Sequence, residues 1–210
     1  MADRQLNIAV FGSGRGSNFQ AILGAIHAGR LRGVAVQVVI SNNSTAGILM
    51  LARAEGIPAY HISERQFSDN AAFVEHLLAT LRNHDVNFIV LAGYMKRIPA
   101  RLIEVFRDRI VNIHPALLPK FGGQGMYGSR VHEAVIAANE RFSGATVHIV
   151  TEEYDRGAIV LQKKVEVAPE DTAETLAAKV LSIEHELYPE ALKMFAEGYV
   201  VKRETVGTSF

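Results

Sequence analysis

The stretch Leu6-Asn7-Ile8-Ala9-Val10-Phe11-Gly12-Ser13-Gly14-Arg15-Gly16-Ser17-Asn18 decides the fold class of this 210-residue chain. Its first six residues are mostly apolar and end at a glycine, which is typical of a buried strand. The residues that follow carry apolar side chains at helical spacing, namely Phe19, Ile22, Leu23 and Ile26. A buried strand, a glycine-rich turn and a helix form the opening unit of a parallel α/β sheet.

The same alternation continues along the chain. Further strands are expected at 34–40, 59–62, 86–92, 110–113, 145–150 and 158–167. Helical stripes separate most of them, the clearest at 73–81. This order predicts an α/β fold: one Rossmann-like, mostly parallel twisted sheet of about seven strands, with helices on both faces and one antiparallel strand in the C-terminal half. We expect a single domain over residues 1–210, with halves at about 1–108 and 109–200.

The last helix has both a start and a break signal. Asp171 with Glu174 is a plausible capping pair for a helix that continues past Val180, Ile183 and Leu187. Pro189 is expected to kink or interrupt this helix, because proline cannot donate the helical hydrogen bond.

Composition excludes several classes of function. Lys+Arg and Asp+Glu both total 22, so no excess of positive charge favours binding to nucleic acid. The absence of cysteine excludes disulfides, thiolate metal sites and a cysteine nucleophile. No segment has the about 20 apolar residues needed to span a bilayer, and Met1-Ala-Asp-Arg-Gln does not begin a signal peptide. We therefore expect a cytoplasmic protein.

The glycine loop 12–18 favours a phosphate site. Glycines let the backbone approach an anion, the helix N-terminus offers N–H groups, and Ser17 and Asn18 add side-chain donors. The alternative is a plain strand–helix turn with a helix cap. A dinucleotide site is disfavoured, since the third glycine falls one residue early for G-x-G-x-x-G and Ser41-Asn42 supplies no acid for a ribose hydroxyl.

Asn112-Ile113-His114-Pro115 closes the expected fifth strand. Residues two apart on a strand share a face, so Asn112 and His114 point to the same side at the carboxyl edge of the sheet. Pro115 keeps His114 extended, and open α/β sheets bind their ligands at this edge. A lone histidine at a strand end is more often structural; the neighbouring asparagine and the following glycine-bearing loop favour a functional site.

Asp155, in Thr151-Glu152-Glu153-Tyr154-Asp155-Arg156-Gly157, is by itself an ordinary turn aspartate. His148 could face either the core or a site. The other histidines are expected to lie scattered on the surface: His27, His61, His76, His84, His132 and His185. His132-Glu133 and His185-Glu186 lack the second histidine of a zinc-protease helix, so no metal site is expected.

Four motifs in order carry a family resemblance. They are Gly-Ser-Gly-Arg-Gly-Ser-Asn at 12–18, Leu-Ala-Gly-Tyr-Met at 91–95, Asn-Ile-His-Pro-Ala-Leu-Leu-Pro at 112–119, and Thr-Val-His at 146–148 followed by Tyr-Asp-Arg-Gly at 154–157. The chain resembles the folate-dependent formyltransferases, and within them the glycinamide ribonucleotide branch, from Asn7 to about Ala196. The methionyl-tRNA and deformylase branches are similar but carry an added domain.

The resemblance implies transfer of a formyl group from 10-formyltetrahydrofolate to the amine of glycinamide ribonucleotide, in purine biosynthesis. It implies small-molecule substrates, no metal, no nucleic acid or membrane partner, and a monomer or homodimer. The residues that it assigns are: for the substrate phosphate and ribose, Gly16, Ser17, Asn18 and Glu184; for folate, Asn70, Met95, Lys96, Arg97, Ile98, Asn112, Thr151, Glu152, Glu153, Tyr154 and Asp155; and for catalysis, Asn112, His114 and Asp155.

By the same resemblance, Asn112 binds the formyl oxygen, His114 donates a proton, and Asp155 raises the pKa of His114. Three positions depart from the family pattern. The loop 121–128 lacks a His-Thr-His segment, Asn70 stands where some members have arginine, and Leu181 stands where relatives can have a polar residue.

Two rival functions stay open at this point. A hydrolase would pass the formyl group to water and release formate without an amine acceptor. A regulatory module would bind a phosphorylated nucleotide at the glycine loop without turnover, which would leave Asn112 and His114 without a role.

Overall fold

The computed structural model of the chain describes residues 5–201. The strands are β1 (Leu6–Phe11), β2 (Val34–Ser41), β3 (Ala59–His61), β4 (Phe88–Leu91), β5 (Ile110–His114), β6 (Phe142–Ile149) and β7 (Ile159–Glu166). The helices are α1 (Ser17–His27), α2 (Gly47–Ala54), α3 (Asn70–Asn83), α4 (Ala100–Val105), α5 (Ser129–Ala137) and α6 (Ala173–Ala196), with a 3-10 turn η1 (Glu64–Gln66). The expectations about a leader and about the ends of the domain rest partly on residues 1–4 and 202–210, which lie outside the described part.

All seven strands form one sheet in the order β3-β2-β1-β4-β5-β6-β7. β1 pairs in parallel with β2 and β4, and the β2–β3 and β4–β5 pairs are also parallel. β6 is antiparallel to both of its neighbours, β5 and β7. The predicted fold class, including its one antiparallel strand, is therefore confirmed.

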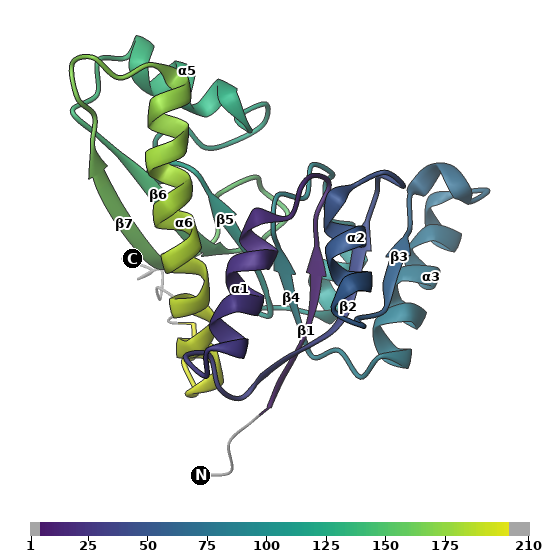
Figure 1. Cartoon of the computed structure of the whole chain (residues 1–210). Helices are drawn as coiled ribbons and strands as arrows, with labels where there is room; N and C mark the ends of the chain where they lie inside the picture. Colours follow the sequence, from purple (N-terminus) through teal and green to yellow (C-terminus); the bar gives the residue numbers. More distant parts are fainter. Residues whose placement is uncertain (1–4, 202–210) are drawn as a thin grey trace, which may run out of the picture.

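The central strands are apolar on both faces because helices cover both sides of the sheet. In β1, Ile8 and Val10 join the core beneath α1, α2, α5 and α6. The alternate residues Ala9 and Phe11 join a second core beneath α3 and α4. Figure 1 shows α1, α2 and α6 on the near face of the sheet. This double coverage is what a continuous apolar strand predicts.

The helix α6 differs from its predicted form at its N-cap, and the interruption expected at Pro189 does not occur. Its N-cap is Thr172, whose hydroxyl accepts a hydrogen bond from Thr175 N at 3.3 Å, so the predicted capping pair Asp171 and Glu174 was wrong. Asp171 instead accepts from Ala168 N at 2.7 Å and pairs with Lys179. The helix also continues through Pro189 without interruption. Buried neighbours on both sides, including Tyr188 and Leu192, hold these turns against the core.

Tyr188 ties α6 to the strands that carry the site. Its hydroxyl is fully buried and lies 2.9 Å from Leu91 O, at the end of β4, and 3.1 Å from Val111 O, near the start of β5. Since one hydroxyl has one proton and two acceptors beside it, the contact is shared between the strands. The inner face of α6 is thereby held in a defined position over the carboxyl edge of the sheet. No helix within residues 5–201 is long and apolar enough to cross a membrane.

Candidate active site

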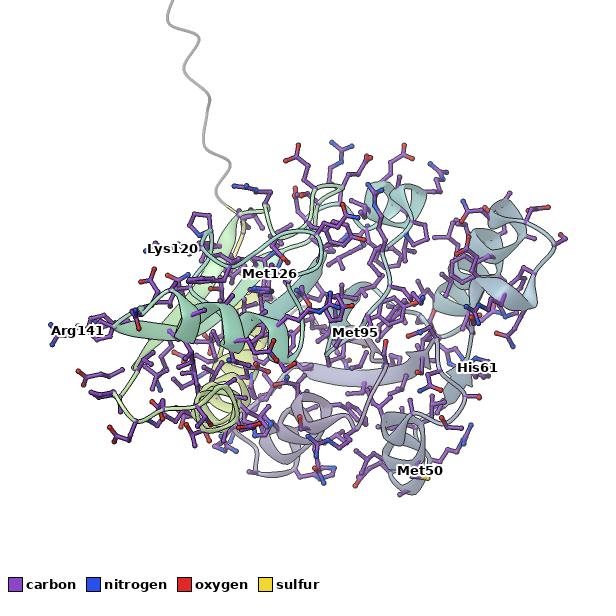
Figure 2. The ribbon with its side chains drawn as sticks, turned by 90° about the horizontal axis from the view of Figure 1, so that it is seen from above. Met50, His61, Met95, Lys120, Met126 and Arg141 are labelled. Atoms are coloured by element: carbon purple, nitrogen blue, oxygen red, sulfur yellow. The ribbon has the colours of Figure 1, made fainter. Side chains whose placement is uncertain are left out.

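A cavity of about 780 Å³ opens at the carboxyl ends of β1, β4 and β5. Its walls come from segments far apart in the sequence: the glycine loop at 13–18, the segment 91–98, the end of β5, the first turn of α5, the turn 150–155, and the inner face of α6. Figure 2 shows Met95 and Met126, which both line the cavity, in the central part of the molecule, whereas Met50 and Arg141 lie toward its edges. The carboxyl-edge position is the one expected for ligand binding.

The glycine loop leads into α1 through a left-handed residue. Gly16 has φ 87° and precedes the helix, and no side chain in the described structure caps the helix N-terminus. A Cβ at Gly16 would lie 2.9 Å from the Ile48 side chain, so both the backbone angle and the space require glycine. The uncapped first turn and Ser17 line the cavity, which suits an anion.

Asn18 and Glu184 meet across this end of the cavity. The Asn18 Nδ2 atom donates to Glu184 Oε2 at 2.6 Å, and both side chains are buried. Burial raises the pKa of Glu184 to about 7, although the hydrogen bond from Asn18 acts in the opposite direction. The Asn18 Oδ1 atom is buried without a hydrogen-bond partner among the described residues. The pair therefore offers a hydrogen-bonding surface beside the glycine loop.

Asn112 is oriented by His148 on the antiparallel strand. Asn112 and His148 are partners in the β5–β6 register, so their side chains share a face, and Asn112 Nδ2 lies 3.2 Å from His148 Nε2. The other ring nitrogen, His148 Nδ1, lies 3.0 Å from Ile149 O and must donate, because a carbonyl only accepts. The Nε2 atom of His148 faces both the Asn112 amide and, at 3.4 Å, the Asp155 carboxylate. The second N–H of the Asn112 amide remains for a ligand.

Asp155 lies between two imidazoles. Its Oδ2 atom is 3.6 Å from His114 Nδ1, and its Oδ1 atom is 3.4 Å from His148 Nε2. The Gly123 N–H donates to Oδ2 at 2.9 Å. Burial alone would raise the pKa of Asp155, but the His148 hydrogen bond, the His114 charge and the Gly123 N–H lower it. The carboxylate is therefore ionised, and the structure brings it beside the predicted catalytic histidine.

His114 is buried, and its Nε2 atom donates to Phe121 O at 2.8 Å. Burial lowers the pKa of His114, and this effect outweighs Asp155 and the Phe121 carbonyl, which act to raise it. The net pKa of His114 is therefore lowered, although Asp155 acts on it in the raising direction. The family resemblance named Asp155 as the partner, but no sequence pattern shows how deeply the His114 ring is buried.

Thr146 fixes the loop that follows β5. Its hydroxyl donates to Ala116 O at 2.6 Å and accepts from Leu118 N at 3.1 Å. Gln162 Nε2 approaches the same hydroxyl at 2.8 Å. Because Thr146 pairs with His114 in the β5–β6 register, these bonds hold the chain immediately after the histidine.

The predicted folate-binding residues are mostly, but not all, in the cavity. Segments 95–98 and 151–155 line it, and Arg97 joins them by donating to Glu152 O at 3.0 Å. Arg97 also lies 5.9 Å above the Tyr154 ring. Asn70, in contrast, is the first residue of α3 and is not among the residues that line the cavity. Among residues 5–201, no group of three or more His, Cys, Asp or Glu side chains is arranged to hold a metal ion.

His132 is a cavity residue that the sequence analysis missed. It was expected on the surface, yet it is only 5% exposed and lines the cavity from the first turn of α5. Its Nδ1 atom is buried without a hydrogen-bond partner in the described structure. Burial, and then the charge of His114, lower the pKa of His132. Its position next to Val131, on the buried face of the helix, was the signal that could have identified it.

Comparisons with known proteins agree with this geometry. A formyl transferase family model matches residues 6–192. A chloroplastic phosphoribosylglycinamide formyltransferase of Vigna unguiculata is 46% identical over 201 residues, which is 96% of this chain and 64% of that protein. The phosphoribosylglycinamide formyltransferase of Haemophilus influenzae is 40% identical over 191 residues, which is 91% of this chain and 87% of that protein.

Solved structures show the same similarity. Glycinamide ribonucleotide transformylase 1 of Symbiobacterium toebii superposes with a TM-score of 0.88 at 37% identity, covering 96% of this chain and 92% of that one. A formyltetrahydrofolate deformylase of Pseudomonas syringae superposes with a TM-score of 0.83 at 26% identity, covering 96% of this chain and 65% of that one.

Proposed function

The chain belongs to the phosphoribosylglycinamide formyltransferase family, and on this premise we propose that it transfers the formyl group of 10-formyltetrahydrofolate to the amine of glycinamide ribonucleotide, yielding the N-formyl product and tetrahydrofolate in purine biosynthesis. The observation that carries the proposal is the shared cavity. It joins an anion-suited glycine loop to an Asn112, His114 and Asp155 cluster.

The two ends of the cavity suit the two substrates. The uncapped α1 N-terminus with Ser17 suits a phosphate, and the neighbouring Asn18 and Glu184 suit ribose hydroxyls. On the other side, segments 95–98 and 151–155 form a wall with apolar and polar groups, the pattern of a site for a flat heterocycle. The formyl carbon would then lie near Asn112 and His114.

Each residue of the cluster has a distinct role. The free N–H of Asn112 donates to the formyl oxygen as negative charge develops on it, a contribution of about 10²–10³ in rate. The attacking amine loses a proton and the departing folate nitrogen gains one, so His114 can carry a proton between them without net change. Asp155, 3.6 Å away, stabilises the imidazolium while the proton resides there. General acid–base work of this kind contributes about 10²–10⁴-fold.

The lowered pKa of His114 fits this cycle. The neutral ring at rest accepts the proton that the amine releases. Because its pKa is lowered, the resulting imidazolium is a stronger acid and gives this proton up readily to the leaving nitrogen. Holding both substrates in one cavity supplies the remaining acceleration through proximity.

The direct test mixes 10-formyltetrahydrofolate with glycinamide ribonucleotide and follows the absorbance change as tetrahydrofolate forms. We expect turnover that requires both substrates. Formate release at the same rate without the ribonucleotide would instead identify a deformylase, the activity in the name of the Pseudomonas syringae neighbour.

A cytoplasmic location and a monomeric or homodimeric state remain predictions. The Vigna unguiculata relative carries the word chloroplastic in its name, which describes that protein alone. Gel filtration with light scattering of the purified chain would determine its oligomeric state.

A further inference from the structure

Ser13 connects the ends of three neighbouring strands. It follows β1, and its backbone N–H donates to Gly93 O, just after β4, at 3.0 Å. Its hydroxyl accepts from Met95 N at 2.8 Å and donates to the side-chain oxygen of Asn42, just after β2. The second residue of the glycine loop is therefore bonded to the opposite wall of the cavity.

Asn42 determines which way the Ser13 hydroxyl acts. A hydroxyl has one proton, and here that proton is directed to Asn42 Oδ1. The lone pairs of Ser13 Oγ are consequently available to the Met95 N–H. Asn42 stands where a dinucleotide-binding protein would have an acid for a ribose; in this chain it orients a serine instead.

The segment that receives this bond is attached to β1 at its start, where Ala92 N donates to Phe11 O at 2.7 Å, and is packed at its far end by the buried Ile98. Residues 92–99 contain no helix or strand, and Gly93 turns the chain with φ 73°. Tyr94 packs edge-on against Phe11 with ring centroids 5.4 Å apart, and Arg97 is attached to Glu152 O at the far end. The Met95 side chain is 54% exposed and lines the cavity, so it is not held by burial. Between these points, the Ser13 hydroxyl accepts a hydrogen bond from the Met95 N–H.

We propose that Ser13 is a positioning residue for the formyl-donor side of the cavity, although it belongs to the loop that is expected to bind phosphate. The inference rests on the proposed function, because it assumes that segment 95–98 contacts the folate. Ser13 would act through the backbone of Met95, and Asn42 would act through Ser13.

A simpler interpretation is that the Ser13 hydroxyl, like that of Ser17, donates a hydrogen bond to the substrate phosphate. The two interpretations predict opposite kinetic results. Loss of a hydrogen bond to the phosphate would raise the KM for the ribonucleotide, whereas loss of the bond that holds Met95 would raise the KM for the folate. Loss of the hydroxyl should cost little stability, since water can reach the exposed Met95 backbone region and replace the bond.

The test compares Ser13→Ala with Ser17→Ala in steady-state kinetics. We expect Ser13→Ala to raise the KM for 10-formyltetrahydrofolate about 3- to 10-fold, the change that loss of one neutral hydrogen bond produces, with the ribonucleotide KM within about twofold. Ser17→Ala should show the reverse pattern. Ser13→Thr, which keeps the hydroxyl, should restore the folate KM. Asn42→Ala should resemble Ser13→Ala, and the double variant should be no worse than Ser13→Ala alone.

Binding of folic acid, which has no formyl group to transfer, tests the role of Ser13 separately from the proposed transfer activity. Calorimetric titration should give a weaker Kd for Ser13→Ala than for the wild type by the same factor, even if the transfer assay failed. An unchanged folate Kd in Ser13→Ala, or a ribonucleotide KM raised as in Ser17→Ala, would overturn the role of Ser13. Absence of folic acid binding to the wild type would overturn it together with the proposed function.

Discussion

The carboxylate of Asp155 lies 3.6 Å from the ring of His114, although 40 residues lie between them in the chain. Asp155 holds this position with a left-handed backbone, φ 54°, and its side chain is mostly buried. The contact depends on the turn between β6 and β7 folding over the end of β5. It is the geometric basis of the first two predictions.

Replacing Asp155 with Asn should lower kcat by about 10²–10⁴-fold and leave the ribonucleotide KM within about twofold. The amide keeps the shape of the carboxylate but cannot stabilise an imidazolium. Asp85→Asn is a matched control, because Asp85 also has a left-handed backbone, φ 51°, but is exposed and lies away from the cavity. Near-normal turnover by the Asp155 variant would remove this residue from the mechanism.

The pKa of His114 should be below its ordinary value of 6.5 in the free protein, because burial is the dominant influence. In Asp155→Asn it should fall further, since Asp155 acts to raise it. NMR titration of the ring protons measures both values, with His114→Gln used to assign the signal. A wild-type value above 6.5, or a rise in the variant, would contradict this description of the site.

Glu184 should make the protein less stable as pH rises. Its folded-state pKa of about 7 lies above the ordinary 4.5, so its contribution is complete below pH 4.5 and is lost as pH rises through 7. Glu184→Gln cannot titrate, so the stability difference between wild type and variant should shift by a few kcal/mol between pH 4.5 and 8. Urea unfolding at both pH values tests this. A constant difference would mean that folding does not raise the pKa of Glu184.

Gly16→Ala should destabilise the protein by about 1–3 kcal/mol and raise the ribonucleotide KM. Its φ of 87° disfavours any side chain, and the new Cβ would lie 2.9 Å from Ile48. Gly14→Ala is the control for stability, because no atom lies within 4 Å of its added Cβ and its φ is not positive. The comparison uses urea midpoints of both variants. Equal midpoints would show that the loop can relax around Gly16.

Much of the fold could be predicted because the sheet is buried on both faces. Continuous apolar runs such as Leu6–Phe11 then separate clearly from the helical stripes between them. The antiparallel β6 could also be anticipated, because the residues 151–157 between its expected strand and the next are too few for the crossover that parallel strands need. What failed were local signals that tertiary contacts override, namely the cap at Asp171 and the break at Pro189.

Less of the candidate active site than of the fold could be predicted from the sequence. Asn112 and His114 follow from strand periodicity, but their approach to Asp155 depends on a register that no local pattern encodes. His132 was missed because a helical histidine beside a glutamate looks like a solvent-facing pair. The lowered pKa of His114 was missed because it reflects depth of burial, a property of the folded chain.

The reversed direction of β6 has a consequence for how the protein is made. His148 and Asp155 reach the cavity only after β6 has paired antiparallel with β5. A nascent chain that ends before residue 155 therefore has the glycine loop but lacks part of the cavity wall. Glu184 arrives later still, on the final helix. Ligand capture should therefore begin only near the end of synthesis, and two fragments separated at the 108/109 boundary should be inert apart and regain function when they associate.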